Sequence, residues 1–449
     1  MLSVLSNRTY RHLFLAQVIA LLGTGLLTVA LGLLAFKLAG DNAGAVLGTA
    51  LAIKMIAYVT VAPVVGAFSA QLPRRAFLIA MDLVRAAIAL LLPFVTEIWQ
   101  IYILVFLLQS ASAAFTPTFQ ATIPDVLTDE TDYTKGLSLS RLAYDLESLV
   151  SPMLAAALLT LISFHWLFSG SVVGFLFSAA LVLSVTLPIS PATARTGSIY
   201  DKTTSGMRIY LATPRLRGLL ALNMAAAAGG AMVIVNTVVI VKGRLGLGDG
   251  DVALALAAFG AGSMLAALNL PRLLDQASDR KLMLTAASAM GLILGALGVG
   301  VSLVPGWTWA IVLAGWLALG VAYSAVLTPG GRLLRRSAHA PDRPAVFAAQ
   351  FALSHACWLI TYPLAGWLGA SLSLSVIFSF FATMTLIAVG LAARVWPSGD
   401  IDIVLHRHPQ LRTDHPHLQA MGVQPHTHVF VIDDLHHQWP GGTGGPAQG

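Results

Sequence analysis

The feature that most constrains this chain is a series of long apolar stretches, each of the length that crosses a lipid bilayer. A transmembrane helix needs about 20 mostly apolar residues to span roughly 30 Å of hydrocarbon. Twelve stretches meet this requirement: 12–37, 44–69, 76–95, 98–118, 135–163, 166–188, 218–241, 251–274, 281–303, 307–327, 345–370 and 372–395. The sequence therefore predicts an all-α membrane protein with 12 transmembrane helices.

The composition agrees with a chain that is solvated by lipid. Of the 449 residues, 57% are hydrophobic and only 10% are charged, against about 25% in ordinary soluble domains. The single cysteine, Cys357, excludes disulfides and thiolate metal clusters. The first apolar run is too long for a signal peptide and lacks a small-residue cleavage site, so we expect it to remain as the first helix.

A polar segment divides the chain into two halves of six spans. The prediction is an N-terminal six-helix bundle over 1–188, a cytoplasmic interdomain loop over 189–217, a C-terminal six-helix bundle over 218–395 and a tail over 396–449. The loop is the longest internal connection and carries five Lys or Arg.

The distribution of cations predicts the orientation. If the N-terminus is cytoplasmic, 20 Lys and Arg lie in inside segments and three lie in outside loops. Cytoplasmic loops of membrane proteins carry such an excess of Lys and Arg. We therefore expect both termini in the cytoplasm, and we attribute the formal charge of +6 to topology and not to nucleic-acid binding.

The segment between the second and third spans carries a family resemblance. Gly66-Ala-Phe-Ser-Ala-Gln-Leu-Pro-Arg74-Arg75 resembles the G-x-x-x-D-R-x-G-R-R signature of the major facilitator superfamily. Gly66 and the two arginines match, whereas Ala70, Gln71 and Pro73 replace the Asp, Arg and second Gly. In that family the Asp helps to lock one conformation, so Ala70 leaves open how this chain makes the lock.

Other segments are similar to the bacterial drug, siderophore and metal exporters of that superfamily. These are Asp82-Leu-Val-Arg85-Ala and the run Phe115–Asp125, which is expected to follow the fourth span. Ser151 and Pro152 resemble a degenerate antiporter element. Over residues 1–395 the resemblance implies a monomeric, proton-coupled transporter of the bacterial inner membrane.

Charged residues within the spans are candidates for coupling proton and substrate movement, because an ionised side chain near a helix centre costs about 2.5–3.5 kcal/mol. Asp82 and Arg85 are three residues apart and Arg141 and Asp145 are four apart, so each pair can neutralise itself on one helix. Glu147 lies about 200° from Asp145 around the helix. The resemblance places spans two and five beside the groove between the halves, which groups Lys54, Asp145 and Glu147. The full set is Lys54, Asp82, Arg85, Arg141, Asp145, Glu147 and His355. Structural ion pairs and, for His355, a hydrogen-bonded helical histidine are the alternatives.

The tail after Trp396 is rich in histidine. Residues two apart in an extended chain project to the same face, and imidazole suits nickel, zinc, cobalt and copper(II). Val429 to Ile432 is predicted as a short strand. The tail is therefore a candidate site for a divalent metal (Ni, Co or Zn), with a solvated or pH-sensitive tail as the alternative. Its histidines are His406, His408, His415, His417, His426, His428, His436 and His437.

These features lead to one main functional hypothesis and two alternatives. The histidine-rich tail is similar to that of bacterial nickel and cobalt resistance exporters, which favours a proton-coupled exporter of divalent metal. The alternatives are efflux of an amphipathic drug or siderophore-like compound, and a metal-sensing membrane protein with little transport. An enzyme is disfavoured because the soluble segments lack a nucleophile and base set, a phosphate loop and catalytic metal spacing.

Overall fold

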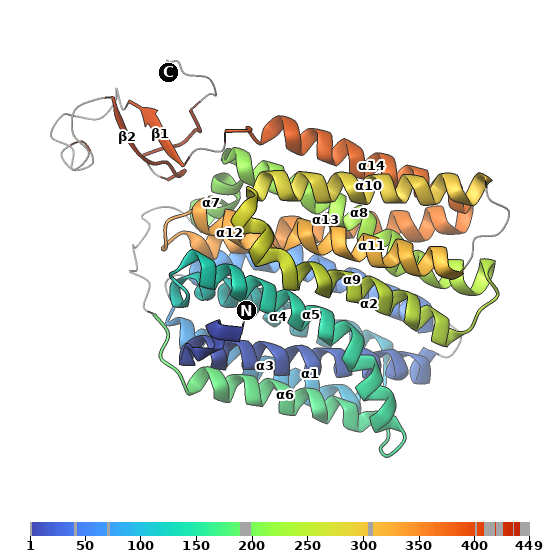
Figure 1. The fold of residues 1–449 in the computed structure, drawn as a ribbon. Coiled ribbons are helices and arrows are strands. Elements are labelled where there is room, and N and C mark those ends of the chain that lie inside the picture. Colours follow the sequence, from blue (N-terminus) through green and yellow to red (C-terminus); the bar gives the residue numbers. More distant parts are fainter. Residues whose placement is uncertain are drawn as a thin grey trace.

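The computed structural model describes residues 2–39, 43–69, 72–188, 199–303, 309–399, 402–407, 418, 425–433 and 435–440. Within this part of the chain, twelve helices of 18 residues or more form one elongated bundle (Figure 1). They are α1 (Arg8–Ala39), α2 (Ala43–Ser69), α3 (Arg74–Leu91), α4 (Ile98–Val126), α5 (Glu130–Leu159), α6 (His165–Leu183), α8 (Pro214–Val238), α9 (Asp249–Gln276), α10 (Asp279–Leu303), α11 (Trp309–Leu327), α13 (Arg343–Ser371) and α14 (Leu374–Val395).

The predicted all-α membrane fold is confirmed, with one long helix for each predicted span. Eleven of the twelve are long and apolar enough to cross a membrane. The remaining one is α5, which carries six charged side chains and packs between α1 and α9.

Helix α4 is longer than predicted. The run 119–125, which was expected to follow the fourth span, lies within α4 despite Pro117 and Pro124. The two prolines remove the backbone hydrogen bonds to the carbonyls of Ala113 and Gln120, a loss that membrane helices tolerate. The Thr118 and Thr122 hydroxyls donate within the helix, to the carbonyls of Ala114 and Thr118, at 3.0 and 2.8 Å. The proline-containing segment continues the helix to Val126.

The helices form two groups that meet along one interface. In the first group α1 packs against α5 and α6, α3 against α4 and α6, and α2 against α4. In the second group α8 packs against α13 and α14, α10 against α11 and α14, and α9 against α11. Between the groups α2 packs against α13, and α5 packs against α9. Figure 1 shows α1, α3 and α6 on one side of the bundle and α10 and α14 on the other.

Short elements gather mainly at one end of the bundle, which we call the basic end because Arg74, Arg217, Arg280 and Arg335 lie there. Helix α7 (Ile199–Ala212) forms part of the segment predicted as the interdomain loop, and α8 already begins at Pro214. The other elements at this end are η1 (Leu2–Ser6), α12 (Gly330–Arg336), β1 (Ile403–His406) and β2 (His426–Val429). The opposite end carries η3 (Leu92–Phe94) and the π-helical η4 (Val239–Arg244).

The tail forms a small folded unit on the basic end (Figure 1). Strands β1 and β2 pair antiparallel, with Val404 opposite His428. The strand predicted over Val429–Ile432 is displaced, because β2 ends at Val429. Phe430 and Ile432 are each 2% exposed and pack into the core of the second group. The apolar residues of this run are therefore used for docking and not for strand pairing.

Candidate transport site and basic-end network

A cluster of polar and aromatic side chains lies midway along the interface between the two groups of helices. The ammonium of Lys54, on α2, lies 5.5 Å from the ring centroid of Tyr58. The Tyr58 hydroxyl donates to Oε1 of Gln109, on α4, at 2.9 Å. The Tyr58 ring contacts the rings of Phe351 and His355 on α13, with centroid distances of 4.8 and 4.7 Å. The aromatic contacts thus join α2 of one group to α13 of the other.

His355, a predicted coupling residue, is held by its own helix. Its Nδ1 lies 2.7 Å from the Phe351 carbonyl oxygen, four residues earlier. The imidazole is half-buried between Tyr58 and Phe351. This arrangement corresponds to the hydrogen-bonded helical histidine that the sequence offered as the alternative.

Glu147 reaches toward Lys54 from α5. The two side chains interact electrostatically, and both are half-buried. Within the described residues neither makes an ion pair shorter than 4 Å. Two opposite charges in a partly buried site, close but not in contact, leave room for a proton or a solute group on the carboxylate.

Arg141 and Asp145 form the ion pair that their four-residue spacing predicts, with 2.9 Å between Nη2 and Oδ1. Arg141 also crosses the interface. Its Nε donates to the Ser263 hydroxyl on α9 at 3.0 Å, and its guanidinium lies 4.9 Å from the ring centroid of Tyr323 on α11. Asp145 is therefore neutralised by Arg141, which leaves Glu147 as the carboxylate that faces Lys54.

Ser151, of the antiporter-like element, lies where α5 crosses α1. A Cβ atom on Gly25 would come within 2.2 Å of the Ser151 side chain and 3.2 Å of Glu147 Oε1. Only glycine at position 25 allows this approach, which positions Glu147 against α1. The Pro152 side chain lies outside the described residues.

Asp82 and Arg85 form a buried pair inside the first group of helices, as their spacing predicts. The Arg85 guanidinium lies between the rings of Phe115 and Phe175, at 4.1 and 4.7 Å from their centroids. These partners come from α4 and α6, within the first group of helices. The arrangement is that of a structural pair.

The signature-like segment contributes directly to closing the basic end. A Cβ atom on Gly66 would lie 2.4 Å from Cβ of Ala348 on α13. Arg74 pairs with Asp125 at 2.5 Å, and Arg343 of the second group pairs with the same carboxylate. Arg75 donates to the Leu183 carbonyl. Ala70 and Gln71, where the sequence departs from the family pattern, lie outside the described residues.

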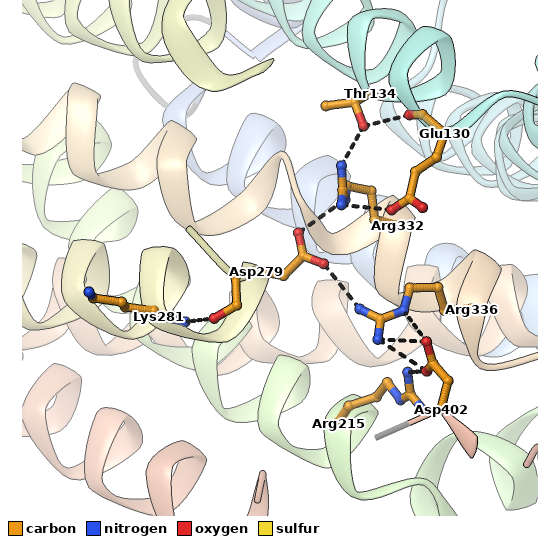
Figure 2. Close-up of polar contacts among 9 residues, drawn as sticks. Glu130, Thr134, Arg215, Asp279, Lys281, Arg332, Arg336 and Asp402 are labelled. Carbon is orange, nitrogen blue, oxygen red and sulfur yellow. Dashed lines mark hydrogen bonds and ion pairs between the residues drawn. The ribbon is translucent and has the colours of Figure 1, made fainter. Parts of the chain in front are cut away.

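A second set of ion pairs was not predicted from the sequence, and we call it the basic-end network (Figure 2). Arg332 on α12 pairs with Glu130 of α5 at 2.7 Å and with Asp279 of α10 at 3.1 Å. Arg336, one turn later, pairs with Asp279 at 3.4 Å and with Asp402 of the tail at 2.9 Å. The network thus runs from the first group of helices, through the second, to the tail.

Two further contacts strengthen this closure. The Tyr133 hydroxyl on α5 donates to the Gly331 carbonyl at 3.2 Å, and Arg335 donates to the Thr128 carbonyl. A sequence signal was present, because Arg332 and Arg336 are four residues apart on one helix face. Their acidic partners come from distant segments, and no local pattern indicates them.

The tail is fixed to this network by Asp402. Its carboxylate also pairs with Arg215 on α8 at 2.5 Å, and Trp439 lies under the Arg215 guanidinium at 5.3 Å. Burial opposes ionisation of Asp402, but Arg215 and Arg336 together lower the pKa of its carboxyl below the ordinary value. Asp402 is therefore charged at neutral pH.

Three of the tail histidines lie near one another. The ring centroid of His428 is 5.5 Å from that of His426 and 5.1 Å from that of His436. Nδ1 of His436 lies 2.8 Å from Oδ1 of Asp433. Even so, the described residues contain no group of three His, Cys, Asp or Glu spaced to hold a metal ion. His437 is exposed, and the side chain of His406 and all of His408, His415 and His417 lie outside the described residues.

Comparisons with known proteins agree with this architecture. The model of the Major Facilitator Superfamily matches residues 13–299. No curated protein sequence matches the chain.

Three solved structures resemble the fold. The human organic anion transporter MFSD10 (TETRAN) has a TM-score of 0.73 and 14% identity, over 86% of this chain and 99% of its own. A bacterial homologue of the iron transporter ferroportin, in its outward-facing state, has a TM-score of 0.71 and 14% identity, over 86% and 98%. The same homologue with soaked iron has a TM-score of 0.69 and 13% identity, over 86% of this chain and 98% of its own. At these identities the likeness shows the fold alone.

The family match extends over well more than half of the chain, and it includes the signature-like segment, Lys54, Glu147 and most of α10. With twelve long helices in two groups, the chain belongs to the Major Facilitator Superfamily of membrane transporters.

Proposed function

We propose that this protein exports a cationic amphipathic compound in exchange for protons, with Glu147 as the coupling group. The observation that carries the proposal is the half-buried Glu147 beside Lys54, without a direct ion pair among the described residues. A proton and a positively charged solute group compete for such a carboxylate. Protonation from outside therefore releases the solute, and loss of the proton to the cytoplasm prepares the site for the next one.

The aromatic side chains around the site support an organic solute. Tyr58 and Phe351 provide aromatic surface beside Lys54, and the ring of Tyr323 already binds the guanidinium of Arg141 in the same interface. Lys54 opposes a bare dication, whose second charge would need further anionic ligands. The site therefore suits one positive charge on an apolar body better than a divalent metal.

The closed basic end supports a transporter that exposes its site alternately to the two sides. The basic-end network and the Asp125 pairs hold the two halves together at that end. We place the basic end in the cytoplasm because cations favour that side. Rocking of the halves would break these pairs and open the site to the cytoplasm. Because one proton enters for each positive charge that leaves, the exchange moves no net charge and is driven by the pH gradient, at about 1.4 kcal/mol per pH unit.

Transport into everted membrane vesicles tests this proposal. With an acidic interior, one pH unit corresponds to about 1.4 kcal/mol per proton, so we expect about tenfold accumulation of a cationic dye such as ethidium. Glu147→Gln should abolish this accumulation, because the amide cannot carry the proton. Asp275→Asn, which removes an exposed carboxylate at the basic end of α9, should leave it unchanged. Full gradient-driven accumulation by Glu147→Gln would exclude Glu147 as the coupling group.

Export of a divalent metal is the second candidate, and the neighbouring rings of His426, His428 and His436 favour it. The ferroportin homologue shares the fold. The same vesicles, loaded in parallel with Ni²⁺, Co²⁺ or Zn²⁺, separate the two candidates. Gradient-driven metal uptake that is lost on deletion of residues 401–449, without dye uptake, would select the metal.

A further inference from the structure

A deep apolar groove opens on the second half of the molecule, outside the candidate transport site. Helix α8 packs against both α13 and α14, whereas α13 and α14 make few contacts with each other. The space between them is a groove of about 770 Å³ over α8. Its lining includes Ala221 on α8, Leu353 and Cys357 on α13, and Thr383 and Leu391 on α14.

The walls of the groove have the chemistry of a site for an acyl chain. Its lining is almost wholly apolar, and Arg217 is the only charged residue among the described residues that line it. Ile387 is 66% exposed and Leu391 is 53% exposed. In a bilayer these side chains face hydrocarbon, so the groove is open to lipid from the side.

The groove is long enough for one leaflet. Its lining on α14 runs from Phe380 to Val395, fifteen residues apart, which is about 22 Å at a rise of 1.5 Å per residue. One leaflet contributes roughly 15 Å of hydrocarbon, half of the bilayer core. A lipid with its headgroup at the basic end can therefore lay an extended chain along the groove.

A cation lies at the end of the groove where the headgroup would be. Arg217 is exposed in the first turn of α8. Within the described residues its guanidinium has no acidic partner, whereas Arg215, two residues earlier, pairs with Asp402. An arginine binds a phosphate through two parallel hydrogen bonds, and basic sites between membrane helices on the cytoplasmic side bind anionic headgroups.

We propose that this groove binds an anionic phospholipid, with an acyl chain over α8 between α13 and α14 and the phosphate at Arg217. The opposite side of α13 carries Phe351 and His355 at the candidate transport site. The bound lipid is thus placed to support the helix that lines that site. The inference uses the orientation proposed above and is independent of the transported solute.

Native mass spectrometry of protein taken from vesicles of equal phosphatidylglycerol and phosphatidylethanolamine tests the site. We expect the wild-type protein to retain phosphatidylglycerol preferentially. Arg217→Gln should reduce that preference about fivefold, the loss expected for one juxtamembrane cation. Arg272→Gln, which removes an exposed cation from the basic end of α9, is the matched control and should behave like the wild type.

A second variant tests the groove itself. Thr383→Trp places a large ring on an exposed wall position and should remove retained lipid of both kinds, while thermal stability stays near that of the wild type. If Thr383→Trp does not fold, Ile387→Trp replaces it. Equal retention of the two lipids by the wild type, or an unchanged preference in Arg217→Gln, would overturn the proposal, whatever dye or metal the protein transports.

Discussion

At the scale of single residues, Asp82 and Arg85 show how this membrane protein accommodates charge away from its candidate site. Asp82 is fully buried and Arg85 is 5% exposed, between two phenylalanine rings. Loss of one partner from such a pair leaves an uncompensated buried charge and costs about 3–5 kcal/mol. We therefore expect Asp82→Asn to lower the melting temperature in detergent markedly, as measured by fluorescence-detected thermal unfolding.

The control for this prediction removes both charges. Asp82→Leu combined with Arg85→Met leaves no unpaired ion and should destabilise the protein less than Asp82→Asn alone. A double variant that is less stable than the single one would show that the pair has a role beyond mutual neutralisation.

Single residues also show which ion pairs the spacing along the sequence can predict and which it cannot. Pairs on one helix, such as Arg141 with Asp145, were predictable because helical geometry fixes which residues face each other. Contacts between helices were not, because they depend on how α2, α5 and α13 are placed. The sequence grouped Lys54 with Glu147 only through the family resemblance, and nothing in it indicated Ser263 or Tyr323 as partners of Arg141.

At the scale of elements, glycines set the distance between α9 and α11. A Cβ atom on Gly320 would lie 1.9 Å from the Phe259 carbonyl oxygen, and one on Gly262 would lie 2.0 Å from that of Leu317. The obstacles are backbone atoms, so the helices must separate if a side chain is added. Small residues allow this close approach, on which helix association in lipid depends.

We expect Gly320→Ala to destabilise the fold by about 1–3 kcal/mol, the usual range for overpacking. Gly295→Ala is the matched control, because its Cβ would meet only the Ala382 side chain at an ordinary 3.8 Å. Thermal unfolding of both variants in the same detergent measures the difference. Equal melting temperatures would contradict the role of the α9–α11 contact.

Elements were predictable where lipid imposes the pattern. Each apolar stretch became one helix, because a membrane span must satisfy its backbone hydrogen bonds internally. Elements outside the apolar stretches were not predicted, because the lipid environment does not determine their structure. The extension of α4, the helix α7 and the strand β1 all depend on contacts with other parts of the protein, and the apolar run after Val429 was used to dock the tail.

At the scale of the whole molecule, the tail and both halves share one set of charges. Asp402 joins the tail to Arg336, and Arg336 joins through Asp279 and Arg332 to Glu130 of the first half (Figure 2). Opening of the basic end must separate Arg332 from Glu130, so a docked tail favours the closed arrangement. A tail that ligates metal or changes its charge would bias transport through this connection.

The contact between His339 and Asp433 makes docking of the tail depend on pH. Nε2 of His339 lies 3.7 Å from Oδ2 of Asp433, and the interaction with this carboxylate raises the pKa of His339 although burial opposes it. Protonated His339 stabilises the docked tail, because its pKa is higher in the docked than in the undocked state. This stabilisation is complete at a pH below the undocked pKa of about 6.5, and it is lost as the pH rises through the docked pKa. Interactions with His339 and His436 lower the pKa of the Asp433 carboxyl despite its burial, so the contribution of its charge is lost only at a pH below the ordinary value of about 4. We therefore expect the tail to loosen as the pH rises above about 6.5.

Spin labels can measure this loosening. In a Cys357→Ala background, which removes the only cysteine, labels at Thr427→Cys and Lys281→Cys report the distance between tail and bundle. The distance distribution should broaden at high pH in the wild type and change less with pH in His339→Gln. Burial lowers the pKa of His426, so protonation of His426 opposes docking at low pH. Both the wild type and His339→Gln retain His426, so the difference between their pH responses isolates His339. Asp402→Asn should broaden the distance distribution at every pH, because the ion pairs of Asp402 do not depend on a histidine. An identical pH response in His339→Gln and the wild type would exclude His339 as the pH-sensitive contact.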